Sequence, residues 1–157
     1  MSRALIIVAC LATAIAAPSV RATTLTLDLN LASIHTEHWA RDTLNQRNEG
    51  LGLTVQLDPS WSLSTGFYRN SYRRTSAYAL AAWTPLRIPL GAWHIDAGGE
   101  AGLVTGYHRS EVTSRPLMAA GLLRVVAPRG WSLDLSIVPN APNRCSGFVG
   151  AQLSLPL

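Results

Sequence analysis

The sequence contains no lysine and only two cysteines, and it has no apolar run long enough to form a membrane-spanning helix. Its thirteen basic side chains are all arginines and stand against nine acidic ones, an excess too mild to indicate a nucleic-acid partner. The longest apolar run covers residues 4–17, whereas a helix needs about 20 residues to cross a bilayer. The four histidines show no spacing that demands a metal, so we expect neither a metal site nor a cofactor.

The short apolar run near the start of the chain is typical of a secretory signal peptide. It follows Arg3 and ends among small residues, which is the order that signal peptides share. Small residues permit cleavage after Ala16 or after Ala22, and we favour Ala22 because a strand pattern begins directly after it. We therefore expect a signal peptide over residues 1–22 and one mature domain over residues 23–157. A retained membrane helix is the alternative.

The number of cysteines in the mature domain depends on cleavage of this leader. Cys10 lies inside it, in a segment similar to a lipoprotein cleavage box, so a lipid anchor is a second alternative. When the leader is removed, Cys145 becomes a lone thiol and the mature domain can form no internal disulfide. The mature domain then carries eleven arginines against nine acidic residues, a formal charge of +2. No linker or long-period repeat divides it.

Apolar and polar side chains alternate along the whole mature chain. In the first run, four leucines from Leu25 to Leu31 alternate with Thr, Asp and Asn, a pattern that predicts a strand with one apolar face. The same pattern predicts strands over residues 24–31, 51–57, 61–67, 76–84, 93–101, 116–127, 131–137 and 149–155. Turn residues separate the runs, including short turns at 58–60, 85–91 and 128–130. Eight strands at this spacing favour a barrel or a sandwich.

Ionisable side chains recur in the middle of the strands on one face only. They belong to the even-numbered set, which includes Asp28, His94, Asp96, Glu100, Arg124, Asp134 and Gln152. In a membrane barrel the apolar face meets lipid and the polar face lines the lumen. Trp61, Trp83, Trp93 and Trp131 lie at strand ends and would form one aromatic girdle. We therefore expect an all-β fold, an eight-stranded antiparallel up-and-down transmembrane β-barrel in the outer membrane. A soluble sandwich is the alternative.

The longer loops carry most of the arginines. If both termini are periplasmic, the loops at 36–49, 71–75, 106–115 and 140–146 face outward. Eight of the eleven mature arginines lie in or beside them: Arg41, Arg47, Arg69, Arg73, Arg74, Arg109, Arg115 and Arg144. Guanidinium groups suit the phosphates of lipid head groups, although ordinary solvated loop charge is the other interpretation.

The inward-facing side chains also differ between the two ends of the barrel. Near the outward loops it becomes small, apolar or aromatic: Gly52, Gly66, Tyr68, Tyr78, Gly102, Val104, Met118, Ala120, Val138, Phe148 and Gly150. Such a lining predicts a slot for a hydrocarbon chain, with the charged half below it. The alternative is a lumen that side chains fill completely.

Polar residues at the same end offer acyl-transfer chemistry. His35 and His38 follow the first strand, and Asn70 and Ser71 follow the third. A histidine within reach of a serine hydroxyl can act as its general base. A second such set consists of His108, Ser110 and Glu111 after the fifth strand.

Several short segments between Asn45 and the C-terminus follow one another in a set order. They are Asn45-Gln46-Arg47, Gly50-Leu51-Gly52, Tyr68 to Ser71, Trp83-Thr84-Pro85-Leu86, Ala101-Gly102-Leu103, Pro116-Leu117, and Val138-Pro139 with Asn140 and Asn143. Their order and spacing resemble the PagP-type outer-membrane lipid A palmitoyltransferases. That family consists of eight-stranded barrels that move an acyl chain from a phospholipid to lipid A.

The resemblance implies roles for individual residues. The catalytic histidine of the family corresponds to His35 or, as the alternative, to His38, and its serine corresponds to Ser71. The family has an aspartate where this chain has Asn70. Prolines flank strands six and seven in the family and loosen the wall where lipid enters, and Pro116 and Pro139 match them.

We therefore expect an acyltransferase in which His35 is the base, Ser71 the catalytic hydroxyl and Asn70 a residue that orients the site. Arg73 and Arg74 would hold phosphates. The acyl chain would lie along Tyr68, Tyr78, Gly102 and Met118, beside Pro116 and Pro139. The expected partners are membrane lipids, with the protein as a monomer and no nucleic acid. The alternative is a non-catalytic outer-membrane barrel that binds lipid or has a structural role in the envelope.

Overall fold

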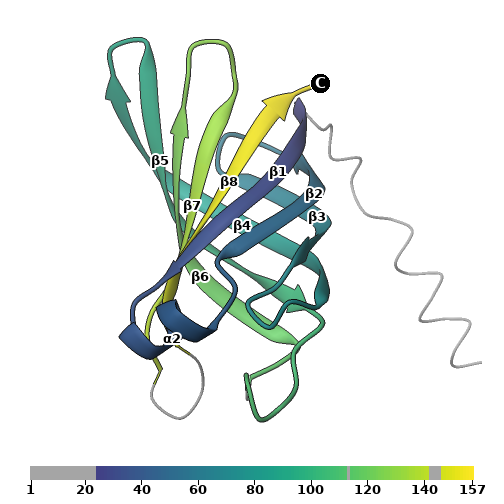
Figure 1. The fold of residues 1–157 in the computed structure, drawn as a ribbon. Helices are drawn as coiled ribbons and strands as arrows, with labels where there is room; N and C mark the ends of the chain where they lie inside the picture. The colour runs from purple at the N-terminus through teal and green to yellow at the C-terminus, as the bar shows by residue number, and fades with distance from the viewer. Residues whose placement is uncertain (1–23, 113, 142–145) are drawn as a thin grey trace, which may run out of the picture.

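The computed structural model describes residues 24–112, 114–141 and 146–157, which form a closed barrel of eight antiparallel strands with one short helix. Each strand pairs with the next along the chain, and β1 closes the ring by pairing with β8 (Figure 1). The elements are β1 (Thr24–His35), α2 (His38–Thr43), β2 (Arg47–Gln56), β3 (Trp61–Arg69), β4 (Thr75–Leu90), β5 (Trp93–Val104), β6 (Leu117–Val126), β7 (Ser132–Val138) and β8 (Phe148–Pro156). No helix in the described ranges is long and apolar enough to cross a bilayer.

The all-β, eight-stranded antiparallel up-and-down barrel is confirmed, and each predicted run overlaps one strand. The sandwich alternative is wrong, because hydrogen bonding continues around a single closed ring. The expected signal peptide over residues 1–22 lies outside the described residues, as do Cys10, Arg144 and Cys145.

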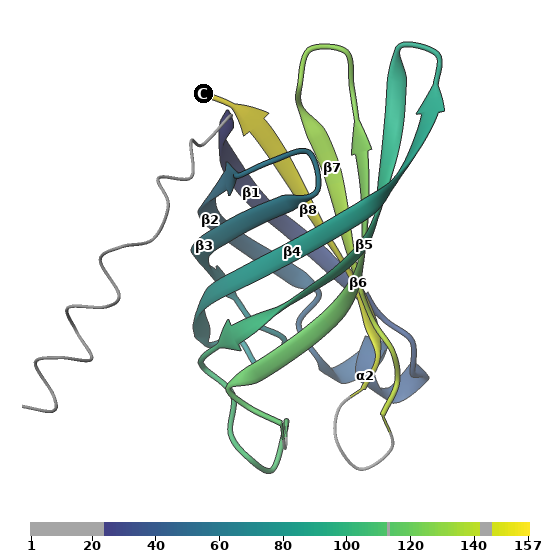
Figure 2. The ribbon, with the colours of Figure 1, turned by 180° about the vertical axis from the view of Figure 1, so that it is seen from behind.

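The turn predicted at residues 85–91 is wrong, because β4 continues to Leu90 and turns only at Gly91. A register shift between Trp83 and Leu86 moves the apolar side chains from odd to even positions, which hid the strand. Two prolines fit here because Pro85 falls in the register shift, residues 86–90 pair with β5 alone, and the ladder with β3 ends at Trp83. The β4–β5 and β6–β7 hairpins rise above the rest of the barrel (Figures 1 and 2).

A second irregularity lies in β1 and decides where His35 points. The pairing of β1 with both neighbours shifts between Asn30 and Ala32. Before the shift, even-numbered side chains face the lumen, with Asp28 fully buried; after it, Ser33 and His35 are buried while Ile34 is 65% exposed. The bulge therefore turns an odd-numbered histidine inward.

The segment predicted as a loop over residues 36–49 contains the short helix α2 and the start of β2. Glu37 is the N-cap of α2 and makes no side-chain capping bond. Ala40 is the buried residue of the helix, and the helix contacts β1. The helix was not predicted, since six residues are too few to show a helical period.

The barrel interior is polar and its outer surface is apolar. Asp28 accepts a 2.6 Å hydrogen bond from Thr54 Oγ1, and an Arg124 guanidinium nitrogen lies 2.8 Å from an Asp134 carboxylate oxygen. The large exposed side chains on the strands include Leu25, Leu31, Ile34, Leu51, Leu53, Leu63, Phe67, Leu86, Ile88, Leu90, Leu103, Leu117, Leu123, Ile137 and Val149. This distribution is the reverse of the usual one in water-soluble proteins.

The four tryptophans expected in one girdle pack as two pairs. Trp61 stacks on Trp83 with ring centroids 6.1 Å apart, and Trp93 meets Trp131 edge to face at 5.2 Å. Trp61, Trp83 and Trp93 are 40–50% exposed.

Candidate active site

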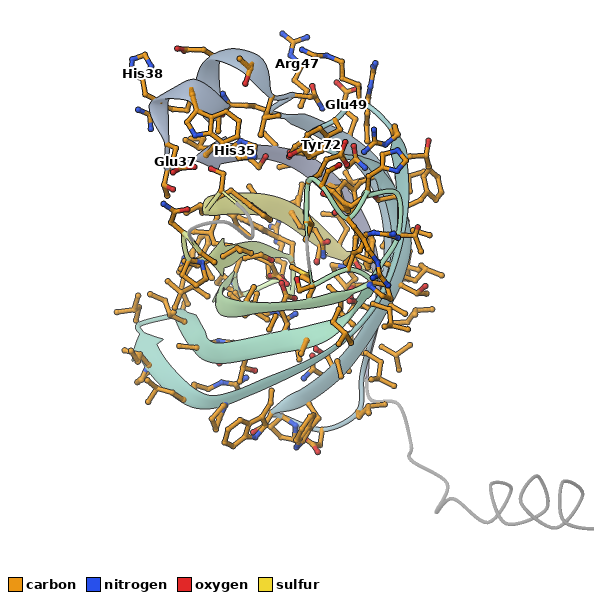
Figure 3. All side chains as sticks on the ribbon, turned by 90° about the horizontal axis from the view of Figure 1, so that it is seen from below. His35, Glu37, His38, Arg47, Glu49 and Tyr72 are labelled. Carbon is orange, nitrogen blue, oxygen red and sulfur yellow. The ribbon has the colours of Figure 1, made fainter. Side chains whose placement is uncertain are left out.

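His35 and Ser71 meet at one end of the barrel. The distance from His35 Nε2 to Ser71 Oγ is 3.2 Å, which is within hydrogen-bond reach. His35 is the last residue of β1, and Ser71 lies in the turn between β3 and β4. His35 is only 2% exposed, so its imidazole is shielded from bulk water, whereas Ser71 is partly exposed. Figure 3 views the barrel from this end, with His35 and Tyr72 close to its mouth.

The alternative histidine lies elsewhere. His38 is on α2 with 84% of its side chain exposed, and its Nδ1 lies 2.8 Å from Asp42 Oδ2 (Figure 3). The second predicted set is also separate, because the Glu111 carboxylate accepts from the backbone N–H of His108 and pairs with Arg74. Of the predicted histidine–serine combinations, the structure brings His35 and Ser71 into contact.

Asn70 holds the turn that carries Ser71. It is fully buried, and its Oδ1 accepts hydrogen bonds from the backbone N–H groups of Tyr72 at 2.9 Å and Arg74 at 3.1 Å. Its Nδ2 donates to Ser76 Oγ and to the Gly106 carbonyl, both at 3.0 Å. Asn70 therefore positions the turn, and its side chain is engaged there and not with the imidazole.

Three buried polar atoms on β1 and β2, one of them in His35 itself, have no hydrogen-bond partner in the described part of the chain. They are His35 Nδ1, Ser33 Oγ and Asn48 Oδ1. Leaving such an atom unpaired costs about 1–3 kcal/mol, so each is suited to a group from outside the protein. Sequence patterning had not indicated Ser33 or Asn48. Their inward orientation depends on the bulge in β1 and on the early start of β2.

The two predicted phosphate-binding arginines differ in their surroundings. Arg74 pairs with Glu111, donates from Nε to the Gly106 carbonyl at 2.9 Å, and lies 5.4 Å from the centre of the Tyr72 ring. These contacts bind the turn to the loop after β5. Arg73 is exposed, and its backbone adopts the left-handed conformation with φ of 61°. Arg73 is therefore the more accessible of the two for a phosphate.

A cavity of about 100 Å³ opens below the pair and runs into the lumen. Tyr68, Tyr78 and Met118 line it, as predicted. Gly102 is not one of its lining residues, because a Cβ at Gly102 would come within 2.1 Å of the Ala79 carbonyl oxygen, against the backbone of β4. The lining also includes many polar side chains: Asn30, Ser33, Asn48, Thr54, Ser62, Ser64, Glu100, Arg124, Asp134, Ser136 and Gln152. The slot is therefore more polar than predicted.

Three tyrosines are among the residues that line this cavity. The hydroxyl oxygens of Tyr68 and Tyr107 lie 3.2 Å apart, and the rings of Tyr68 and Tyr78 have centroids 6.0 Å apart. Tyr107 comes from the loop after β5, where burial raises the pKa of its phenol. It therefore remains a neutral hydroxyl at the cavity wall.

Pro116 and Pro139 flank an incomplete seam between β6 and β7. The described ladder runs from Gly121 opposite Ile137 to Val126 opposite Ser132. Residues 117–120 of β6 pair with β5 but not with β7. Pro139 lies where the ladder would continue, and it has no N–H to donate. Both prolines are exposed.

In the described residues, no group of three His, Cys, Asp or Glu side chains is arranged to hold a metal ion. No protein-family model matches the chain, and no curated protein matches it.

Proposed function

We propose that this protein is an outer-membrane β-barrel that transfers an acyl chain from a phospholipid to lipid A, with His35 as general base and Ser71 as nucleophile. The observation that carries the proposal is the 3.2 Å contact between His35 Nε2 and Ser71 Oγ at the mouth of the lumen cavity. Histidine and serine in contact at a cavity are the parts that acyl transfer requires.

The outer surface supports a membrane location. Leucine, isoleucine, valine, phenylalanine and tryptophan side chains are exposed around the strands, whereas Asp28, Asp96 and Asp134 are buried inside. In water, an apolar surface of this extent would promote aggregation, but in a bilayer it contacts lipid chains. The two tryptophan pairs suit the boundary between lipid tails and head groups.

The geometry suits a two-step transfer. In the first step, the Ser71 hydroxyl gives its proton to His35 Nε2 while its oxygen attacks the ester carbonyl of the phospholipid. The ester bond to glycerol breaks, and the glycerol oxygen takes the proton from His35, which leaves an acyl group on Ser71. In the second step, a lipid A hydroxyl gives its proton to His35 and attacks this acyl group, and Ser71 regains its proton.

Substrate access is supported by the seam between β6 and β7. Because the described ladder stops at Gly121, residues 117–120 of β6 are paired with β5 but not with β7. A lipid chain could pass there from the membrane into the cavity without crossing the polar surface. Arg73 is exposed beside Ser71 and suits a phosphate of the donor or acceptor.

The test is acyl transfer by the refolded full chain in mixed vesicles of radiolabelled phospholipid and lipid A. We expect His35→Ala and Ser71→Ala each to lower the rate at least a hundredfold, because each removes a reacting group. His38→Ala is the matched control and should stay within about twofold, since its ring is exposed on α2. Absence of transfer by a correctly folded, heat-modifiable barrel would leave a lipid-binding or structural role in the envelope.

A further inference from the structure

Two buried polar side chains lie beneath the His35–Ser71 pair, each with an atom that lacks a hydrogen-bond partner in the part of the chain that the structure describes. The atoms are Ser33 Oγ and Asn48 Oδ1, on residues that are 6% and 8% exposed. Both residues line the lumen cavity, as Ser71 does. Buried polar atoms are paired in nearly all folded proteins, so these two are open to a polar group from outside the chain.

The strand register places both residues one step deeper than the pair. Ser33 precedes His35 by two positions on the inward face of β1, and its N–H donates to the Gln46 carbonyl at 2.9 Å. Asn48 follows Gln46 by two residues and lies on the inward face of the adjacent strand β2. Two residues advance a strand by about 6.6 Å. The two side chains therefore flank the first carbons of an acyl chain that runs from Ser71 into the cavity.

Their other contacts determine what they can bind. Asn48 Nδ2 donates to the Arg69 carbonyl at 2.8 Å, and a carbonyl can only accept. The amide nitrogen must therefore face Arg69, which leaves Oδ1 as an acceptor in need of a donor. The Ser33 hydroxyl can donate or accept. A methylene chain can bond to neither atom, whereas a hydroxyl group has a proton to donate to Oδ1 and lone pairs to accept from Oγ.

We propose that Ser33 and Asn48 form a hydroxyl-binding subsite that selects acyl chains hydroxylated on the third carbon over plain chains of the same length. The inference rests on the proposed transfer at Ser71. The third carbon lies two carbon–carbon bonds beyond the ester carbonyl, and its hydroxyl reaches partners about 2.8 Å further away. That reach matches one step of the strand. The chain hydroxyl donates to Asn48 Oδ1 and accepts from Ser33 Oγ.

The test compares two phospholipid donors, one with a 3-hydroxyhexadecanoyl chain and one with a hexadecanoyl chain, in kcat/KM assays with the full chain. We expect about a tenfold preference for the hydroxylated donor, the effect of one or two net hydrogen bonds. Ser33→Ala should lower this preference at least threefold. It should fold normally, because Ser33 Oγ has no partner to lose within the described residues.

Ser64→Ala is the matched control, since Ser64 lines the same cavity away from Asn48. Ser64 pairs with Thr54, which follows Asn48 by six residues along β2. It should leave the preference between the two donors unchanged. Equal use of both donors by the wild type, or an unchanged preference in Ser33→Ala, would overturn the subsite.

A binding measurement separates failure of the subsite from failure of the proposed function. If neither donor is used, the thermal unfolding midpoint is measured with free 3-hydroxyhexadecanoic acid and with hexadecanoic acid. A larger upward shift with the hydroxylated acid, lost in Ser33→Ala, supports the subsite without catalysis. Equal shifts with the two acids contradict it.

Discussion

The side-chain amide of Asn70 donates a 3.0 Å hydrogen bond to the carbonyl oxygen of Gly106, and so joins the turn that carries Ser71 to the loop after β5. The same nitrogen donates to Ser76 Oγ, whose own proton goes to the Thr105 carbonyl at 2.6 Å. Both partners of this nitrogen are thus acceptors. An amide fits this place, whereas a carboxylate would put an oxygen against them.

Asn70→Asp should therefore destabilise the barrel instead of improving the site. The aspartate would match the PagP-type family, yet it would lose two donated hydrogen bonds and set its charge against the Gly106 carbonyl. We expect a loss of about 1–3 kcal/mol in the free energy of unfolding, measured by urea titration in detergent micelles.

Asn140→Ser, on an exposed loop residue, serves as the control and should stay within about 0.5 kcal/mol of the wild type. Unchanged stability together with faster acyl transfer in Asn70→Asp would show that the amide is not required for the turn.

The loop after β5 should loosen in acid. Partial burial acts to raise the pKa of Glu111. Hydrogen bonds from the His108 backbone N–H and from Arg74 outweigh this effect and hold the pKa below its usual 4.5. A lowered folded-state pKa gives stability that is complete above about 4.5 and is lost as the pH falls through the folded value. The edge-to-face contact of Tyr72 and Tyr107 should report this in near-ultraviolet circular dichroism.

We expect the tyrosine signal of the wild type to decline as the pH falls below about 4.5, the ordinary pKa of a glutamate. Glu111→Gln should remove this transition, because no carboxylate remains to be protonated. Glu49→Gln, at an exposed position on β2, should keep it. A transition of equal size in Glu111→Gln would assign it to another group.

Closing the seam between β6 and β7 should block the proposed lipid entry. In a Cys145→Ser background, cysteines at Ala120 and Val138 would stand opposite each other if the ladder continued. Once they are joined, acyl transfer from membrane-embedded phospholipid should fall at least tenfold and return on reduction. A cross-link between Leu123→Cys and Leu135→Cys, within the existing ladder, should leave the rate within about twofold. Equal rates for both oxidised variants would argue for another entry route.

The buried ion pair of Arg124 and Asp134 should matter more to stability than any surface pair. Their side chains are 12% and 5% exposed, and Asp134 also accepts from Ser132 Oγ at 2.8 Å. Asp134→Ala leaves a buried guanidinium without its carboxylate, and we expect a loss of about 3–5 kcal/mol in urea unfolding. Asp42→Ala breaks the exposed contact with His38 and should cost less than about 1 kcal/mol. Similar losses in the two variants would contradict this ranking.

The number and order of the strands were predictable because alternation is a local property. Leu25, Leu27 and Leu29 face outward and Asp28 faces inward, as any regular strand with one apolar face requires. The prediction failed at the bulges. Leu86, Ile88 and Leu90 continue the outer face of β4 on the opposite parity, so the strand was mistaken for a turn.

Part of the candidate site could also be predicted. The sequence predicts His35, Ser71 and the cavity residues Tyr68, Tyr78 and Met118, mainly through a resemblance in the order of short segments. Ser33 and Asn48 were missed, since an unpaired buried atom is a property of the folded lumen. The engagement of Arg74 with Glu111 was missed for the same reason, because the two lie 37 residues apart in the chain.

By itself, the sequence determined that the chain alternates between an apolar and a polar face eight times, since side chains on a strand point to opposite sides with a period of two residues. The tertiary structure decided that His35 meets Ser71. Strict alternation from Asp28 would have turned His35 outward, and the bulge at Asn30 to Ala32 reverses this. The bulge shifts the pairing of β1 with both β2 and β8, so its effect depends on strands that are far apart in the sequence.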